Sequence, residues 1–263
     1  MKHSERIRIP YPPQMPIHSL SLSVLQLLDM PNTTWLITGA SRGLGLETAR
    51  QLLQTPTNTV FGTCRSPSTA TELAALVSSP GTLYIVKLDV TDEASIKAAA
   101  DEVFKLLNGA GLDYVLNNAG INRGDDLAFN FEPSALSDMM ATNALGPALV
   151  SGYLLPAIER SDRRVIMNMT SRLASIGSDY GTIDTCYCMS KIALNMLTYK
   201  QAREHPDLIP IVLEPDWVKT DMGGPGAETE PAESVAGTLK VLRGLTKESA
   251  GKFFSYKGNK VPW

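Results

Sequence analysis

Histidine is scarce in this chain of 263 residues, and its scarcity excludes several classes of enzyme. Only three histidines occur, and two of them, His3 and His18, precede the first recognisable strand. The third is His205. This distribution argues against a Ser-His-Asp hydrolase, a zinc hydrolase with several histidine ligands and a histidine general base.

Cysteine is equally rare, with Cys64, Cys186 and Cys188 as its three occurrences. An odd and small number of cysteines does not form a disulfide framework, so a reducing, cytoplasmic compartment is expected. Cys186 and Cys188 lie on either side of Tyr187, but no third or fourth ligand stands nearby, so no metal site is expected. We expect these two thiols to pack within a helix.

Excess positive charge and long apolar runs are also missing. Lysine and arginine number 24 against 27 acidic residues, which gives a net charge of −3 and a pI near 5.7. No positive excess is left to neutralise a phosphate backbone, so nucleic acid is not an expected partner. No apolar run reaches the roughly 18 residues that span a bilayer, so no membrane partner is expected either. An apolar share of 43% fits a globular protein with a sizeable core.

Short β-branched runs alternate with longer helical patterns from residue 34 onward. This alternation predicts stacked βαβ units in a single α/β domain, with one doubly wound parallel sheet of about seven strands. The predicted strands are residues 35–38, 59–64, 83–88, 113–117, 164–169, 209–213 and 252–255. The predicted helices are residues 43–54, 69–77, 92–107, 133–159, 185–204 and 232–243. Pro147 and Pro156 are expected to bend or break the fourth helix.

Two segments stand apart from this pattern. Residues 1–32 hold four prolines between residues 10 and 16, and we interpret them as an N-terminal extension that is disordered or loosely docked. A targeting segment, or a working chain that begins at Met30, are the alternatives. Residues 33–263 form the predicted domain. Within it, residues 214–231 are rich in glycine and proline, which predicts a mobile lid over the carboxyl ends of the strands.

A glycine-rich turn follows the first predicted strand directly. The sequence Thr-Gly-Ala-Ser-Arg-Gly-Leu-Gly at 38–45 leads from that strand into a helix. Such glycines allow a tight turn and a close backbone approach, and the amides at a helix N-terminus can hold a pyrophosphate. A glycine-rich loop alone is weak evidence, but a strand before it and a helix after it indicate dinucleotide binding.

Two arginines stand where an NAD-binding protein usually has an acidic residue. No Asp or Glu lies between Glu47 and Glu72, so no carboxylate is available near the end of the second strand. Arg65 follows that strand directly, and Arg42 lies inside the glycine turn. Both could bind the extra phosphate of NADP, so NADP(H) is the predicted cofactor. The alternative is two solvated surface arginines.

Three further groups point to chemistry. Tyr187 and Lys191 stand four residues apart on a predicted helix and therefore share a face. A nearby ammonium lowers the pKa of a tyrosine from about 10, which would let Tyr187 exchange a proton near neutral pH. Ser171, at the end of the fifth strand, could donate a hydrogen bond to a substrate oxygen or cap a turn. The run 113–120 ends a buried strand with two asparagines, which fits a functional site and a strand-end turn equally.

Together these residues resemble the short-chain dehydrogenase/reductase family over residues 33–263. The motifs follow the order of the family: the glycine turn, Leu-Asp-Val at 88–90, Asn-Asn-Ala-Gly at 117–120, Asn143, Ser171 and the Tyr187/Lys191 pair. Within the family the chain resembles the branch of the C-signalling factor and small carbonyl reductases. The segments 170–177 and 216–225 and the Pro-Trp ending at 262–263 carry this resemblance.

The resemblance implies a Rossmann-type fold and hydride transfer between NADP(H) and a carbonyl or an alcohol. It implies that Tyr187 is the general acid in reduction and that Ser171 polarises the carbonyl. It also implies that Lys191 binds the nicotinamide ribose and tunes Tyr187, and that Asn143 holds a proton-relaying water. With the glycine turn and the two arginines, the expected cofactor contacts are Gly39, Ser41, Arg42, Gly43, Leu44, Arg65, Asp89, Val90, Asn117, Ala119, Gly120, Tyr187, Lys191, Pro215, Val218 and Thr220.

The chain departs from the family pattern at two places. Ser171 precedes Tyr187 by a longer loop than is common in the family, although the branch named above shares that loop. After the sixth strand the branch usually has His-Pro-Gly-Trp, and this chain has Glu-Pro-Asp-Trp at 214–217. Asp216 thus replaces a glycine that lies near the cofactor. Its carboxylate either turns into the substrate pocket, where it would favour a cation, or turns away as a surface charge.

We therefore predict an NADPH-dependent ketoreductase that acts on a small organic carbonyl compound. An imine or iminium reductase, or a reductase-cyclase, is the first alternative, favoured if Asp216 faces a cationic substrate. The second alternative is a nucleotide-binding signalling protein without significant turnover, and the intact set of Asn143, Ser171, Tyr187 and Lys191 counts against it. By the same resemblance, a homodimer or homotetramer is an open expectation.

Overall fold

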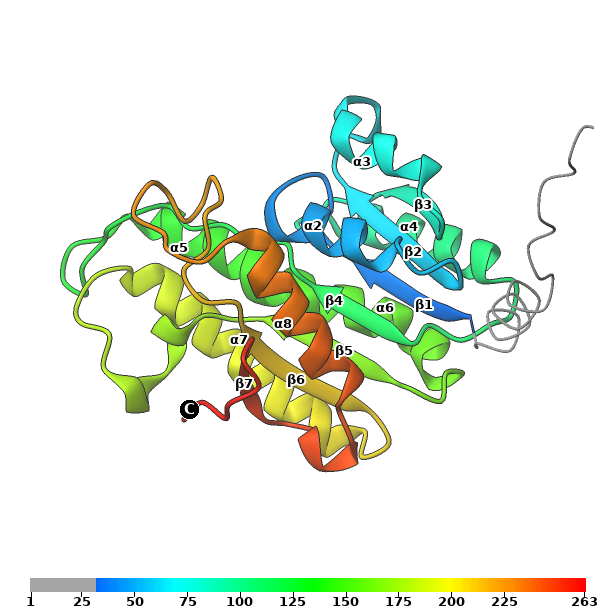
Figure 1. Cartoon of the computed structure of the whole chain (residues 1–263). Coiled ribbons are helices and arrows are strands. Elements are labelled where there is room, and N and C mark those ends of the chain that lie inside the picture. The colour runs from blue at the N-terminus through cyan, green and yellow to red at the C-terminus, as the bar shows by residue number, and fades with distance from the viewer. Residues whose placement is uncertain (1–31) are drawn as a thin grey trace, which may run out of the picture. The chain divides into compact units, whose positions relative to one another are not determined.

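The computed structural model of the protein describes residues 32–263, which form one compact unit. The expected N-terminal extension lies outside the described residues, apart from Asn32. Seven parallel strands form one sheet in the order β3-β2-β1-β4-β5-β6-β7 (Figure 1). The strands are β1 (Thr33–Ile37), β2 (Asn58–Cys64), β3 (Thr82–Lys87), β4 (Tyr114–Asn117), β5 (Val165–Met169), β6 (Ile209–Glu214) and β7 (Phe253–Ser255). The doubly wound, Rossmann-type sheet is therefore confirmed, and its order reverses between β1 and β4.

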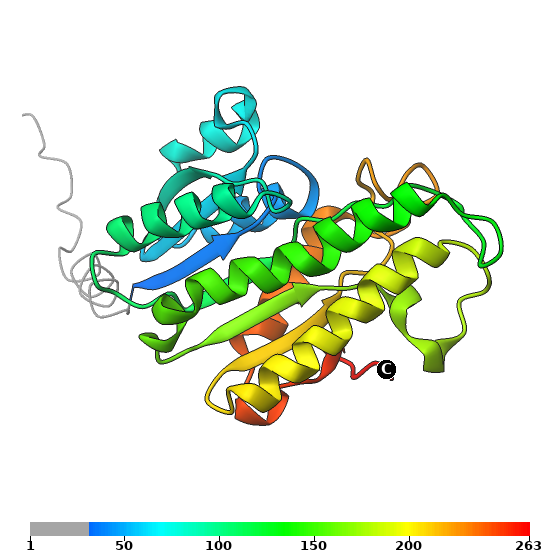
Figure 2. The same ribbon diagram turned by 180° about the vertical axis from the view of Figure 1, so that it is seen from behind.

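Helices cover both faces of this sheet. They are α2 (Gly43–Leu52), α3 (Thr71–Ala75), α4 (Glu93–Leu107), α5 (Pro133–Met140), α6 (Gly146–Glu159), α7 (Thr185–Glu204) and α8 (Pro231–Arg243). Successive side chains of a strand point to opposite faces, so Trp35 and Ile37 join a core with α2, α3 and α8, whereas Leu36 joins a core with α4 and α6. Figure 2 shows α4, α6 and α7 lying across the second face. Within residues 32–263, no helix combines the length and the apolar composition needed to cross a bilayer.

Each predicted strand lies within two residues of an observed one, and the helix predicted at 185–204 coincides with α7. The helix predicted at 69–77 is wrong in length, because α3 covers five residues between two short 3-10 turns. The helix predicted at 133–159 is interrupted just before the first of the two prolines expected to bend or break it. A π-helical segment, Ala141–Leu145, separates α5 from α6. Pro147 has no amide hydrogen to donate to residue 143, four residues earlier and inside this segment, whereas Pro156 lies inside α6 without ending it.

The glycine turn joins β1 to α2 through unusually close backbone packing. Gly39 and Gly43 have φ angles of +69° and +55°, a left-handed conformation that side chains rarely adopt. A Cβ atom on Gly45 would lie 2.3 Å from the carbonyl oxygen of Gly39 and 2.7 Å from the side-chain nitrogen of Asn118. The first turn of α2 can therefore pack directly against the turn before it.

This packing predicts opposite effects for two helical glycines. Gly45→Ala is expected to lower the melting temperature by several degrees, because its methyl group would overlap backbone atoms. Gly152→Ala is the matched control in α6, where an added Cβ meets nothing within 4 Å. That variant should gain about 0.5–1 kcal/mol from the higher helix propensity of alanine. Thermal and urea unfolding measure both effects, and equal stabilities would contradict the close approach at Gly45.

Candidate active site

Lys191 lies where three parts of the chain meet at the carboxyl edge of the sheet. Its side chain is 3% exposed, and Nζ donates a hydrogen bond of 2.7 Å to the carbonyl oxygen of Met169, the last residue of β5. A Cβ atom on Gly120, just after β4, would lie 3.4 Å from Nζ and 3.2 Å from Oδ1 of Asn143. Tyr187 lies one turn earlier on α7, with its ring centroid 5.6 Å from Nζ. The structure thus brings Asn143, Tyr187 and Lys191 together.

Asn143 is held by the π-helical segment and by contacts far along the chain. Its Oδ1 accepts a hydrogen bond of 2.9 Å from the amide of Ile121, and its Nδ2 donates to the carbonyl of Ile121 at 2.8 Å. Nδ2 also donates to Oγ of Ser190 at 3.0 Å, so both amide protons are used. The Asn143 side chain therefore ties the segment after β4 to α7. A π-helical turn at such a place is typical of functional sites.

Ser171 caps a turn, which is one of its two expected roles, and its side chain lies close to that of Tyr187. Its Oγ accepts a hydrogen bond of 3.2 Å from the amide of Leu173 and caps the short 3-10 turn that follows β5. The same hydroxyl lies close enough to the phenol of Tyr187 to exert a lowering effect on its pKa. Ser171 and Tyr187 therefore present two hydroxyl groups side by side.

The expectation that the pKa of Tyr187 is lowered is wrong for this arrangement. Burial raises the pKa of Tyr187 well above its usual range, and the nearby Ser171 hydroxyl opposes this rise without cancelling it. Burial also lowers the pKa of Lys191 to about 7. The reason is that both groups are removed from water together, so the charged form of each is disfavoured.

The glycine turn offers a cradle for a dinucleotide. No side chain caps the first turn of α2, which starts after Arg42 and carries no acidic residue in that turn. The positive end of the helix is thus available to a phosphate group. The segment after β4 lies against this turn, because Asn118 Nδ2 donates to the carbonyl of Thr38 at 2.9 Å and the amide of Ala119 donates to Thr38 Oγ1 at 3.0 Å. These residues fit a nicotinamide dinucleotide.

The two arginines lie exposed at neighbouring strand ends. The loops that carry them are joined by a hydrogen bond of 2.8 Å from the amide of Ala40 to the carbonyl of Thr63. Arg42 forms an exposed ion pair of 3.3 Å with Asp221. Burial would raise the pKa of Asp89, but hydrogen bonds from Thr91 and the nearby Arg65 guanidinium outweigh it and lower that pKa. Arg65 therefore lies near the expected adenine contact.

The side chains of several expected cofactor residues make contacts within the protein. The side chain of Asn117 is 1% exposed and donates to Ser151 at 3.1 Å and to Asn168 at 2.8 Å, within the core. The side chains of Leu44 and Val90 pack on the two hydrophobic cores.

The segment between β6 and α8 (residues 215–230), which we call the β6–α8 segment, carries the remaining expected contacts. Thr220 lies against the glycine turn, since a Cβ atom on Gly43 would lie 3.6 Å from it. Val218 is 4% exposed and pairs with Thr229, and the carbonyl of Pro215 accepts a hydrogen bond of 2.6 Å from Ser234. This segment is therefore folded onto the site and onto α8.

Asp216 is partly buried, and its carboxylate is hydrogen-bonded within the protein. Its φ angle is +75°, a left-handed conformation that favours glycine, the residue that the resemblance to the family leads us to expect at this position. Its Oδ1 accepts a hydrogen bond of 3.0 Å from the amide of Trp217, and its Oδ2 accepts one of 3.2 Å from Thr229. Arg172 lies 3.8 Å from Oδ1. The carboxylate thus has its partners within the protein.

Two sets of site residues were not anticipated. Glu214 is 1% exposed and forms an ion pair of 2.8 Å with Arg172, which directly follows Ser171. Burial raises the pKa of Glu214, and Arg172 opposes that rise. The only signal in the sequence was the pair of acids at 214 and 216.

The second unanticipated residue is Asp126. Its Oδ1 accepts a hydrogen bond of 2.9 Å from the amide of Cys186, and it so caps α7 from another loop.

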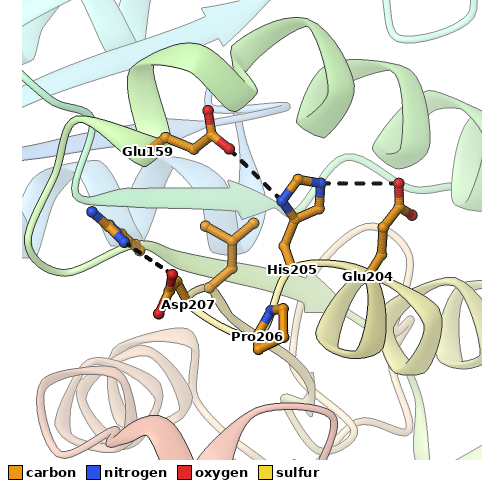
Figure 3. A pocket seen from close by; sticks show the side chains of 7 residues that line it. Glu159, Glu204, His205, Pro206 and Asp207 are labelled. Atoms are coloured by element: carbon orange, nitrogen blue, oxygen red, sulfur yellow. Dashed lines mark ion pairs between the residues drawn. The ribbon is translucent and has the colours of Figure 1, made fainter.

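A pocket of about 300 Å³ lies at the opposite edge of the sheet, between the ends of α6 and α7 (Figure 3). His205 lies there between Glu159 and Glu204, at 3.7 Å and 3.9 Å. Arg164 and Leu208, which line the same pocket, precede β5 and β6. Ligands of doubly wound sheets bind at the carboxyl ends of the strands, so this pocket is not the candidate site.

Burial of Lys191 predicts a pH-dependent stability. Its pKa is lowered from 10.5 to about 7 on folding. Between these values the unfolded chain binds more protons at this residue, so Lys191 makes the free energy of unfolding rise from pH 7 to pH 10. Lys191→Met should remove this part of the rise, measured by urea unfolding without cofactor. Lys200→Met, exposed on the same helix, is the control, and an unchanged pH dependence in Lys191→Met would contradict the prediction.

Comparisons with known proteins agree with this geometry. A family model described as short chain dehydrogenase matches residues 33–231. The C-signal of Myxococcus xanthus is 35% identical over 154 residues, 58% of this chain and 93% of that protein. Norsolorinic acid ketoreductase of Aspergillus parasiticus is 30% identical over 253 residues, 88% of this chain and 91% of that protein. The structure of NADPH-bound carbonyl reductase from chicken fatty liver is 38% identical, with a TM-score of 0.83 over 89% of this chain and 100% of that chain. The chain therefore belongs to the short-chain dehydrogenase family of oxidoreductases.

Proposed function

We propose that the protein reduces the carbonyl group of an apolar ketone with NADPH, and that Tyr187 donates the proton. The observation that carries this proposal is the meeting of Asn143, Ser171, Tyr187 and Lys191 beside the glycine turn. The similarity to a carbonyl reductase and to a ketoreductase supports the same reaction.

NADPH would lie along the carboxyl edge of the sheet. The first turn of α2 would hold its pyrophosphate, and Arg42 and Arg65 would hold its additional phosphate. Asp89 and Gly120 would contact the adenosine. When bound, its nicotinamide ring supplies the hydride. The chicken carbonyl reductase, whose structure contains NADPH, supports this choice of cofactor.

The hydroxyl groups of Ser171 and Tyr187 would bind the ketone oxygen together. Because burial raises the pKa of Tyr187, its phenol stays protonated at neutral pH and can serve as an acid. As negative charge develops on the ketone oxygen, Tyr187 transfers its proton to that oxygen and becomes a phenolate. Lys191, when protonated, stabilises the phenolate from one helical turn away.

The surroundings of the site favour an apolar substrate. Three loops meet at the carboxyl edge of the sheet: residues 121–132, residues 172–184 and the β6–α8 segment (Figures 1 and 2). They carry half of the large apolar side chains that are exposed on the described part of the chain: Leu127, Phe129, Ile176, Tyr180, Ile183, Trp217 and Met222. Such a concentration marks a binding surface. The internal partners of Asp216 favour a neutral ketone over a cationic imine.

Tyr187→Phe tests the proton donor. Removal of one hydroxyl leaves the ring volume nearly unchanged, so NADPH binding should stay within a few fold of the parent. Turnover with an apolar diketone should fall by about 10² to 10⁴, as is typical of general acid catalysis. Tyr199→Phe, on the same helix and 39% exposed, is the matched control. Unchanged turnover in Tyr187→Phe would show that another group is the acid.

Arg65→Asp tests the choice of cofactor. A lost charge-assisted hydrogen bond costs about 1.5–3 kcal/mol, which is roughly a ten- to hundredfold rise in the Kd of NADPH. The Kd of NADH should change much less, because NADH lacks the additional phosphate. Fluorescence titration measures both constants, with exposed Arg160→Asp as the control. Equal affinities of the parent for NADPH and NADH would contradict the role of these arginines.

The similarity to C-signal favours one further candidate, a nucleotide-binding signalling protein without significant turnover. The parent protein distinguishes the two candidates when it is incubated with NADPH and a panel of ketones, quinones and imines. Binding of NADPH without oxidation of NADPH by any of these compounds would favour the signalling protein.

A further inference from the structure

We propose that Glu214 and Asp216 position Arg172, and through it Ser171, against the β6–α8 segment. We call Arg172, Glu214 and Asp216 the carboxylate clamp. Its effect on turnover rests on the proposed ketone reduction, whereas its effect on the order of the β6–α8 segment does not.

Glu214 is the centre of the carboxylate clamp. It is the last residue of β6, and only 1% of it is exposed. Both carboxylate oxygens are used: Oε1 accepts from Arg172 Nη2 at 2.8 Å, and Oε2 accepts from the amide of Asp216 at 2.8 Å. A carboxylate buried to this degree needs such partners. One side chain therefore connects the loop after β5 with the start of the β6–α8 segment.

Arg172 connects this carboxylate to the site itself. It directly follows Ser171, and it lies inside the 3-10 turn that the Ser171 hydroxyl caps. Its guanidinium also lies close enough to Tyr180, on the loop that we expect to face the substrate, for the two side chains to interact electrostatically. A shift of Arg172 would therefore move the Ser171 hydroxyl and the wall of the substrate site together.

Asp216 extends the carboxylate clamp across the β6–α8 segment. Its two oxygens accept hydrogen bonds from Trp217 and Thr229, which lie near opposite ends of this segment. Two backbone hydrogen bonds complete the closure: the amide of Thr229 donates to the carbonyl of Trp217 at 3.1 Å, and the amide of Lys219 donates to the carbonyl of Thr229 at 3.0 Å. The ends of the segment and the loop of Ser171 are thereby tied to one charged group.

If the ion pair between Arg172 and Glu214 positions Ser171, its replacement by apolar residues should change turnover. If the pair only stabilises the fold, the same replacement should change stability at most. Replacement of a buried ion pair by apolar residues of similar size often leaves stability unchanged. Such a replacement would preserve the fold but remove the directional bond that holds the turn after Ser171 against Glu214. A fall in turnover in the folded variant would then show that the orientation of the Ser171 hydroxyl depends on this pair.

The test is the double variant Arg172→Met/Glu214→Met in the full-length protein. Its kcat for ketone reduction is expected to fall at least tenfold, because the Ser171 hydroxyl is no longer held in place, while the Kd of NADPH stays within threefold. Hydrogen exchange at the amides of Trp217, Lys219 and Thr229 should become at least tenfold faster. Arg172→Lys, which keeps a charged donor, should recover part of kcat. The control is Arg164→Met/Asp207→Asn, an ion pair of 4.0 Å at the opposite edge of the sheet.

Unchanged exchange together with unchanged kcat in the folded double variant would overturn the proposal. If the parent reduces no ketone, the proposed function fails, and the exchange measurement alone decides for or against the carboxylate clamp. If the double variant does not fold, Asp216→Gly takes its place, because glycine accepts the φ angle of +75°. Faster exchange at Trp217 and Thr229 in that variant would support the clamp, and unchanged exchange would overturn it.

Discussion

The geometry of the site depends on the contacts of one buried amine, that of Lys191. Its hydrogen bond to the carbonyl of Met169 fixes α7 to the end of β5, and its Nζ lies so close to Gly120, in the segment after β4, that a Cβ atom there would be 3.4 Å away. A buried ammonium with a single polar partner is costly, which is why its pKa falls to about 7. In the proposed reaction, this amine lies beside the tyrosine that becomes a phenolate. Burial of Lys191 therefore lowers the free energy of unfolding, but it places a poorly solvated amine where its positive charge would stabilise that phenolate.

The fold was largely predictable because its strands are buried on both faces and are mostly apolar, as in β5 and β6. The end of α7 was equally clear from local composition. The π-helical segment Ala141–Leu145 was not, because no local propensity distinguishes it from an α-helix. It accompanies two features, the missing amide hydrogen of Pro147 and the hydrogen bonds of Asn143 to Ile121, and only the first can be read from the local sequence.

The features of the site also fall into two groups, those that local sequence predicts and those that depend on contacts between distant segments. The glycine turn and the Tyr187/Lys191 spacing are local patterns, so the sequence displayed them. The raised pKa of Tyr187 depends on burial by segments distant in the chain, and the inward side chain of Asn117 depends on contacts from α6 and β5. Pairing of Arg172 with Glu214 joins residues that only the order of the sheet makes neighbours.

The cap that Asp126 provides for α7 has a consequence for how substrate range can change. Asp126 lies in the same loop as Leu127 and Phe129, which are exposed and which we propose to face the substrate, yet it accepts a hydrogen bond from the amide of Cys186 next to Tyr187. Under the proposed function, substrate recognition and proton transfer therefore depend on one short stretch of chain. Exchange of this loop for a foreign one would leave a helix amide without its acceptor, so new specificities are accessible mainly through substitutions that spare Asp126.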